Sequence, residues 1–127
     1  MNEQSNQIRQ LSSDDAGLMR SLLDLFGEAF EDDETYRSNQ PDDSYLERLL
    51  SREHLVVLVA MQSDQVVGGL AAYELQKFEQ PRSELYIYDL AVHESFRRQG
   101  VATQLINALR KEATRRRAWV VYVQADY

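Results

Sequence analysis

Apolar and polar residues follow each other along the chain with two different periods, one helical and one extended. Three segments carry apolar residues three and four positions apart, as amphipathic helices do: residues 18–30, 43–50 and 101–113. Three others are nearly continuous apolar runs, typical of buried strands: residues 55–61, 66–75 and 84–92. Shorter runs predict a further strand near each end of the chain: residues 8–11 and 118–125. The predicted order is β-α-α-β-β-β-α-β.

The connections between these segments define the predicted sheet. The turn QSDQ, residues 62–65, joins two strands into an antiparallel hairpin. Gly68 and Gly69 inside the second of these strands indicate a bulge or a close backbone approach. The helix at 101–113 lies between two strands, which predicts a parallel crossover. We therefore expect an α/β domain around a mixed, mostly antiparallel sheet, with the acidic segment 28–36 running into a loop.

Length and composition fit a single folded domain over residues 1–127. With 43% hydrophobic and 28% charged residues, the composition is that of an ordinary globular protein. No apolar run reaches the roughly 18 residues that a membrane helix needs, and the polar N-terminus lacks the pattern of a leader peptide. The absence of cysteine excludes disulfides, thiolate metal sites and a cysteine nucleophile. A reducing cytoplasm is the expected location.

The net charge indicates which classes of ligand the protein can bind. A net charge of −7 disfavours nucleic acid, which needs a basic surface to neutralise its phosphates. Acidity suits a cationic ligand, although it also serves solubility alone. His54 and His93 do not have the spacing of a metal pair on a helix or strand. We therefore expect no metal, no membrane contact and no nucleic acid partner.

The segment FRRQGVAT, residues 96–103, follows a predicted strand and opens a predicted helix. A glycine turn at this place presents free N–H groups at the positive end of the helix dipole, which favours a phosphate. Gly100 permits close approach of a ligand to the backbone, and Arg97 and Arg98 supply charge. No Walker lysine follows Gly100, and the glycine pattern of a dinucleotide site is absent. The segment predicts an anion cradle, with a solvated surface turn as the alternative.

Residues 90–109, LAVHESFRRQGVATQLINAL, resemble the acetyl-coenzyme A (acetyl-CoA) motif of the GNAT superfamily of N-acetyltransferases. Arg97, Gly100 and Ala102 occupy the three positions that define its pyrophosphate loop. The predicted element order is similar to that of the family over nearly the whole chain. Three segments are similar to the GNAT-type aminoglycoside 3-N-acetyltransferases: DLFGEAFEDDETY (24–36), LAAYELQKFEQPRSELYIYDLAV (70–92) and YVQADY (122–127). This resemblance implies a GNAT-type fold and an antibiotic-resistance enzyme that acetylates an aminoglycoside.

The resemblance implies a site for acetyl-CoA in two parts. Strand residues would pair their backbone with the pantetheine arm: Leu90, Ala91 and Val92. Loop residues would hold the pyrophosphate: Arg97, Arg98, Gln99, Gly100, Val101, Ala102 and Thr103. In the family the strand splays from its neighbour at a bulge, where the thioester sits, and an amide around Ala91 would polarise the acetyl carbonyl.

Acyl transfer to an amine needs a group that takes up a proton, because amines are mostly ammonium ions at neutral pH. Asp89 interrupts an apolar strand, where a carboxylate is costly unless it is bonded or lies at a wet opening. We expect it to be the general base in the substrate cleft, with a structural Asp at a bulge as the alternative. Asp126 follows the last strand at the same end of the sheet and is a second catalytic and substrate-binding candidate, unless it is merely solvated.

Acidic and aromatic residues supply the candidate substrate contacts. Five acids lie where a helix is expected to end, and acids oppose the helix dipole there: Glu28, Glu31, Asp32, Asp33 and Glu34. These acids would steer a polycationic aminoglycoside, and one or two of them would hold it; the alternative is a solvated helix end. Tyr36 and Tyr88 are expected to pack against sugar rings, although aromatic residues beside an apolar strand are also typical of a core.

The sequence departs from the family at its C-terminus. Family members continue with a helix, which carries the tyrosine that protonates the leaving thiolate, and with a closing hairpin, whereas this sequence stops at Tyr127. We expect a fragment truncated after the fifth strand or, if the chain is whole, a homodimer joined near the apolar strand edge. Two alternatives to an aminoglycoside enzyme stay open: an acetyltransferase for another polyamine such as spermidine, and a non-catalytic module that binds CoA or a cation.

Overall fold

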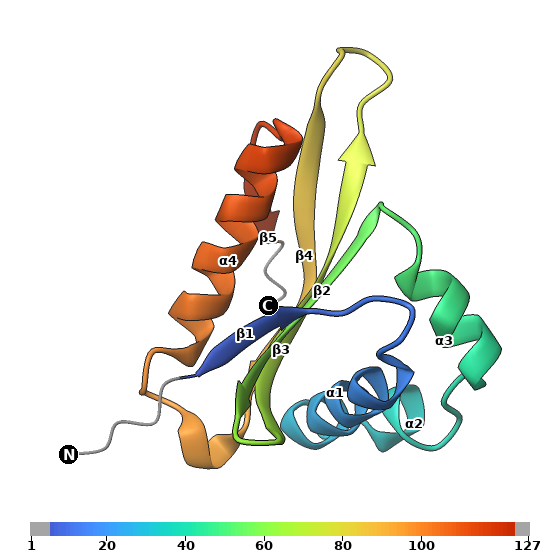
Figure 1. The fold of residues 1–127 in the computed structure, drawn as a ribbon, viewed down its shortest axis with the longest axis vertical. Coiled ribbons are helices and arrows are strands. Elements are labelled where there is room, and N and C mark those ends of the chain that lie inside the picture. Colours follow the sequence, from blue (N-terminus) through green and yellow to red (C-terminus); the bar gives the residue numbers. More distant parts are fainter. Residues whose placement is uncertain (1–5, 124–127) are drawn as a thin grey trace.

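The chain forms a five-stranded sheet with helices on both faces (Figure 1). The computed structural model describes residues 6–123. In chain order the elements are β1 (Gln7–Gln10), α1 (Ala16–Ala29), α2 (Asp33–Tyr36), α3 (Asp43–Leu50), β2 (Leu55–Gln62), β3 (Gln65–Gln76), β4 (Ser83–Val92), the 3-10 turn η1 (Glu94–Phe96), α4 (Val101–Arg116) and β5 (Val121–Val123). The predicted fold class is confirmed, and the predicted elements occur in the predicted order, with the short turns α2 and η1 in addition.

The strands lie in the order β1-β2-β3-β4-β5, so that neighbours in the sequence are neighbours in the sheet. The first four strands pair antiparallel. Strands β4 and β5 pair in parallel, with Leu85–Ile87 against Val121–Val123. The predicted hairpin and the predicted crossover are therefore both present. The crossover helix α4 covers one face of the sheet, and α1, α2 and α3 lie on the other side (Figure 1).

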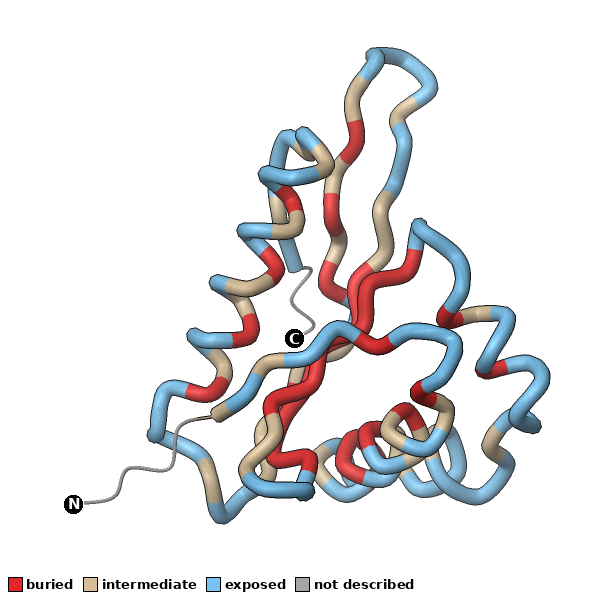
Figure 2. The backbone as a smooth tube through the Cα atoms, viewed as in Figure 1, coloured by how far each residue is buried: buried red, intermediate tan, exposed pale blue. Residues whose placement is uncertain are grey.

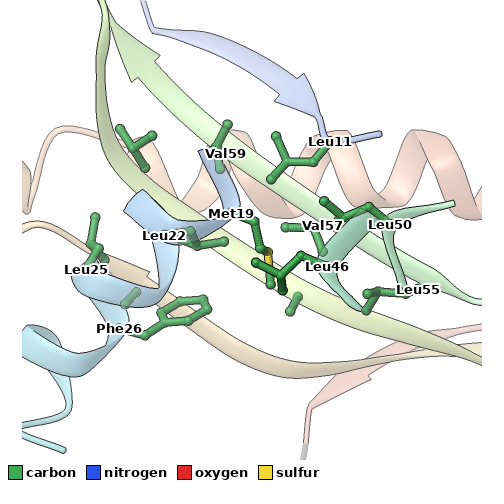
Figure 3. Close-up of a cluster of buried hydrophobic side chains, with 13 residues drawn as sticks. Leu11, Met19, Leu22, Leu25, Phe26, Leu46, Leu50, Leu55, Val57 and Val59 are labelled. Atoms are coloured by element: carbon green, nitrogen blue, oxygen red, sulfur yellow. The ribbon is translucent and has the colours of Figure 1, made fainter. Parts of the chain in front are cut away.

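Strand β2 is buried on both faces, as its continuous apolar sequence predicts. Its first six residues are buried, and their side chains alternate between two cores. Val57 and Val59 pack in the core formed with α1 and α3 (Figure 3), whereas Val56 and Leu58 pack in the core formed with α4. Figure 2 shows buried residues gathered along the central strands and on the inward helix faces. The sheet is therefore held rigidly between two packed layers.

Gly68 and Gly69 mark both features that the sequence predicts for them. The pairing of β2 with β3 changes register after Ala60, which leaves Val67, next to Gly68 in β3, as the extra residue of a bulge. A Cβ atom at Gly69 would overlap Leu22 of α1 and would lie 2.9 Å from the carbonyl oxygen of Leu58. The missing side chain therefore lets α1 approach the sheet closely.

Gly69→Ala is expected to lower the free energy of unfolding by about 1–3 kcal/mol, the usual cost of overpacking a core. Urea unfolding followed by circular dichroism measures this change. Gly17→Ala is the matched control, because a Cβ atom at Gly17 in α1 meets no atom within 4 Å. The control is expected to keep the stability or to raise it by up to about 1 kcal/mol. Equal stability of the two variants would contradict the close approach of α1.

Two predicted segments differ from the structure. The acidic segment forms the one-turn helix α2 instead of a loop, because the Asp32 carboxylate accepts a hydrogen bond from the N–H of Thr35 at 3.1 Å and caps the turn. The last strand, Val121–Val123, begins later than predicted. Before it, the N–H of Trp119 donates to the carbonyl oxygen of Ser83 at 2.9 Å, outside the regular ladder.

Candidate active site

The loop before α4 presents backbone N–H groups that have no partner in the helix. Gly100 caps α4 with a φ of +83°, in the left-handed region that favours glycine, and no side chain caps this end of the helix. The N–H of Gln104 donates to the carbonyl oxygen of Gly100 at 3.0 Å. The amides of Val101, Ala102 and Thr103 precede this first bond of the helix and keep their donors free. This geometry can hold an anion.

Two connected clefts run from this loop along β4. The first, of about 270 Å³, is lined by the loop and the start of α4. The second, of about 350 Å³, lies between the end of α1, β4 and the loop, and is lined by Ala29, Phe30, Leu90, Ala91, Val92, Arg97 and Ala102. The two clefts share Val92, Arg97 and Ala102. They therefore form one groove from the Gly100 loop to the end of α1.

The groove follows a strand edge. On one side, Leu90–Val92 pair with Gly68–Leu70 of β3. On the other side, β5 pairs with Leu85–Ile87, and no strand among residues 6–123 continues this pairing along β4. An extended ligand can therefore pair with the open backbone groups of β4, as the resemblance implies for a pantetheine arm.

The loop fits the pyrophosphate of acetyl-CoA. A Cβ atom at Gly100 would project into open space, with no atom of the protein within 4 Å. Arg98 also has a positive φ, of 65°, so the loop is bent tightly on both sides of Gln99. Arg97 lines the groove, but its Nε donates to the carbonyl oxygen of Val92 at 3.1 Å. The sequence suggested charge as the role of Arg97; the structure adds that it ties the loop to the end of β4.

A bulge in β4 directs Asp89 toward α2. The pairing with β3 changes register between Ile87 and Asp89, so that Tyr88 is the extra residue. Tyr88 and Asp89 consequently face the same side of the sheet, the side of α1 and α2. The hydroxyl of Tyr36 donates to Asp89 Oδ2 at 2.9 Å. Burial raises the pKa of Asp89, and the hydrogen bond from Tyr36 opposes that increase. Such a carboxylate is suited to proton uptake.

Aromatic rings connect Asp89 to the groove. Phe30 lines the groove, and its ring centroid lies 5.6 Å from that of Tyr36. Burial and the nearby Asp89 carboxylate raise the pKa of Tyr36, which keeps its hydroxyl protonated. Tyr36 therefore contacts the carboxylate, a role that the sequence did not suggest. Tyr88 is 60% exposed beside it, and its ring meets Tyr73 edge-on at 5.8 Å.

The acidic residues of segment 28–36 form two groups: some stabilise α2, and others line a pocket. Asp32 caps α2, and the Asp33 carboxylate accepts a hydrogen bond from Arg37 at 3.4 Å. Glu28 and Glu31 instead line a pocket of about 250 Å³ that adjoins the groove. Asp32 and Asp33 therefore help to hold α2, whereas Glu28 and Glu31 share their pocket with Arg97 and with His93, whose Nε2 lies 3.9 Å from Glu28 Oε1. Sequence reasoning could not separate them, because the division depends on the unexpected turn α2.

Three further expectations concern Asp126, a metal site and membrane contact. Asp126 lies outside the described residues. Within residues 6–123, no group of three or more His, Cys, Asp or Glu side chains is arranged to hold a metal ion. The helices in that part of the chain are too short or too polar to cross a bilayer.

Known proteins are similar to this chain in sequence and in fold. The model of the acetyltransferase (GNAT) family matches residues 18–126. An aminoglycoside acetyltransferase from an uncultured soil metagenomic sample is 52% identical, with a TM-score of 0.94 over 96% of this chain and 80% of that chain. A second one from such a sample, solved with trehalose and with sisomicin, is 34% identical, with a TM-score of 0.87 over 95% of this chain and 78% of that chain.

More distant similarity extends to other acyl acceptors. A ribosomal-protein-alanine N-acetyltransferase from Brucella melitensis biovar Abortus 2308 is 25% identical, with a TM-score of 0.74 over 96% of this chain and 81% of that chain. No curated protein matches the sequence. The matched residues include the Gly100 loop, the open edge of β4 and Asp89. The family that these residues suggest is thereby confirmed, and the chain belongs to the acetyltransferase (GNAT) family.

Proposed function

We propose that this protein is an aminoglycoside N-acetyltransferase that moves the acetyl group of acetyl-CoA to an amino group of the antibiotic, by resemblance the 3-amino group of the deoxystreptamine ring. One observation carries the proposal: Asp89 lies beside one end of a groove whose other end is the Gly100 loop. The similarity to two aminoglycoside acetyltransferases, one solved with sisomicin, supports the substrate class. Antibiotic resistance is the expected consequence.

Some residues of this chain bind acetyl-CoA, and another removes a proton from the substrate amine. Acetyl-CoA, when bound, would supply the acetyl group as an activated thioester, and CoA would leave as the free thiol. The amides at the start of α4 hold the pyrophosphate, and the edge Leu90–Val92 pairs with the pantetheine arm. An amide around Ala91 polarises the carbonyl group. Asp89 takes the proton that the substrate ammonium group must lose.

Side chains of both charges line the groove and the pocket beside it, which favours one anionic and one cationic ligand. Arg97 and Arg98 lie at the loop end. Glu28 and Glu31 line the pocket that adjoins the groove. We propose that these two acids attract the polycationic substrate and that the exposed ring of Tyr88 contacts one of its sugar rings. An anionic cofactor beside the Gly100 loop gives a reason for two arginines there in a chain of net charge −7.

Release of free thiol from acetyl-CoA tests the proposal. Thiol release is expected with gentamicin or sisomicin and not with spermidine. Release with spermidine alone would favour the other polyamine. No release with any amine, together with a rise in melting temperature on addition of CoA, would leave the non-catalytic binding module. Two-dimensional NMR of the product locates the acetyl group, and acetylation of another amine would overturn the 3-amino assignment alone.

The proposal also includes a cytoplasmic location and a homodimer. An enzyme that consumes acetyl-CoA is expected where this metabolite is made. Trp119 is 66% exposed and Val123 is 63% exposed beside the edge strand β5. Exposed apolar side chains at a strand edge support a contact between two copies near that edge.

A further inference from the structure

We propose that Tyr36 is a positioning residue for Asp89: its hydroxyl holds one carboxylate oxygen and leaves the other for the substrate amine. The inference rests on the proposed function, since it assigns a partner to the proposed general base. It moves Tyr36 from the sugar-contacting role predicted from the sequence to a role in proton transfer. It also gives the short turn α2 a function.

A single hydrogen bond joins Tyr36 to Asp89. The hydroxyl oxygen of Tyr36 lies 2.9 Å from Asp89 Oδ2, although the two residues are 53 positions apart in the sequence. No other residue in the described part of the chain donates a hydrogen bond to this carboxylate. Oδ1 is therefore the oxygen that is free to accept a proton from the substrate. A carboxylate held at one oxygen keeps its orientation when the substrate arrives.

Tyr36 is held in place on its ring side. Its ring lies 5.8 Å from the ring of Phe26 and 5.6 Å from that of Phe30, between centroids. Phe26 is fully buried in the core formed with α1. The ring of Tyr36 therefore packs on one side against the hydrophobic core. The hydroxyl therefore points at Asp89 from a packed position rather than from a free side chain.

The backbone of the turn is anchored as well. Nε2 of Gln40 donates to the carbonyl oxygen of Tyr36 at 3.1 Å and to Oδ1 of Asp24 in α1 at 3.0 Å. Arg37 packs flat on Gly27 of α1, where a Cβ atom would lie only 2.5 Å from Cδ of Arg37. Gly27 therefore lets α2 dock on α1 at the distance that brings Tyr36 to Asp89.

Around this contact, burial raises the pKa of Asp89, and the neighbouring phenols stay protonated. Tyr36 faces the carboxylate from α2, Tyr88 from β4 and Tyr73 from β3. Burial raises the pKa of both Tyr36 and Tyr73, so their hydroxyls stay neutral. The Asp32 carboxylate also raises the pKa of Tyr36, at longer range. The hydrogen bond from Tyr36 favours the charged form of Asp89 and lowers its pKa against the effect of burial.

Tyr36→Phe tests the inference, because phenylalanine keeps the ring contacts and removes only the hydroxyl. Without the hydrogen bond, the pKa of Asp89 rises, and a larger fraction is protonated at a given pH. We expect the acid limb of kcat/KM to move up by about one pH unit, with turnover falling most at low pH and recovering as the pH rises. Binding of acetyl-CoA should not change. Tyr45→Phe is the control, since Tyr45 is an exposed phenol on α3 whose loss should leave the pH profile unmoved.

A second measurement does not depend on turnover. The carboxyl carbon signal of Asp89, assigned by its loss in Asp89→Asn, is titrated by ¹³C NMR in the wild type and in Tyr36→Phe. The midpoint is expected to rise in the variant. An unchanged midpoint and an unchanged profile would overturn the inference, and so would an equal loss of activity at every pH. Failure of the wild type to release thiol with any aminoglycoside would instead overturn the proposed function, which keeps the two failures distinct.

Discussion

Asp89→Asn is expected to lower kcat at least about 100-fold, the usual contribution of a general base. Asparagine has the size of aspartate, and its side-chain oxygen can still accept the hydrogen bond from Tyr36, so the bulge of β4 should persist. The amide cannot take up the proton of the attacking amine. Thiol release at saturating acetyl-CoA and aminoglycoside measures the loss, and the KM for acetyl-CoA should stay the same because the cofactor groove does not include this side chain.

Glu84→Gln is the matched control for this substitution. Glu84 is also a carboxylate of β4, but it accepts hydrogen bonds from Arg82 at 3.4 Å and lies on the far side of the bulge from the groove. Removing its charge should leave kcat within about threefold, because this carboxylate pairs with Arg82 and does not line the groove. Near-normal turnover of Asp89→Asn would remove Asp89 from the catalytic role.

Gly100→Val is expected to weaken acetyl-CoA binding about 5- to 140-fold through backbone strain alone. Valine at a φ of +83° costs about 1–3 kcal/mol, and each 1.4 kcal/mol is about a factor of ten in affinity. The loop can escape this strain only by turning the amides of α4 away from the pyrophosphate. A valine that keeps the loop conformation would project its side chain into the same space. Calorimetric titration with acetyl-CoA measures the change.

Gly17→Val separates this effect from a general one. Gly17 and Gly100 both have open space where a Cβ atom would be, but Gly100 is the glycine with a positive φ among the residues that the structure describes. Gly17→Val should therefore bind acetyl-CoA with wild-type affinity. In the absence of cofactor the Gly100 variant should still unfold in one cooperative transition, with a melting temperature lowered by several degrees because of the backbone strain. Unchanged affinity in Gly100→Val would disprove the loop assignment.

Features that depend on neighbours in the chain could be predicted from the sequence. The residues of α3 were predicted with the boundaries that the structure has, because a helical period is a local property. The burial of β2 on both faces follows from its unbroken apolar run. Gly100 could be placed at a turn before a helix for the same reason, since its freedom at positive φ belongs to the residue itself.

The arrangement of the site depends on contacts between distant segments, which no local pattern encodes. An aspartate within an apolar strand indicates a special position, but only the register of β4 against β3 shows that a bulge turns Asp89 toward α2. The roles of Asp32 and Asp33 changed in the same way, because the acids that looked free are used to form a helical turn.

The sequence by itself therefore determined the elements, their order, the family and the loop that suits a pyrophosphate. The tertiary structure alone decided which groups meet around Asp89. Tyr36 reaches it from 53 residues away. The end of α2 lies close to α1 there, because the side chain of Arg37 packs on Gly27 in space that a Cβ atom would fill. Periodicity and backbone preference act within a few residues of the chain, whereas this pairing results from how α1 packs on the sheet and α2 on α1.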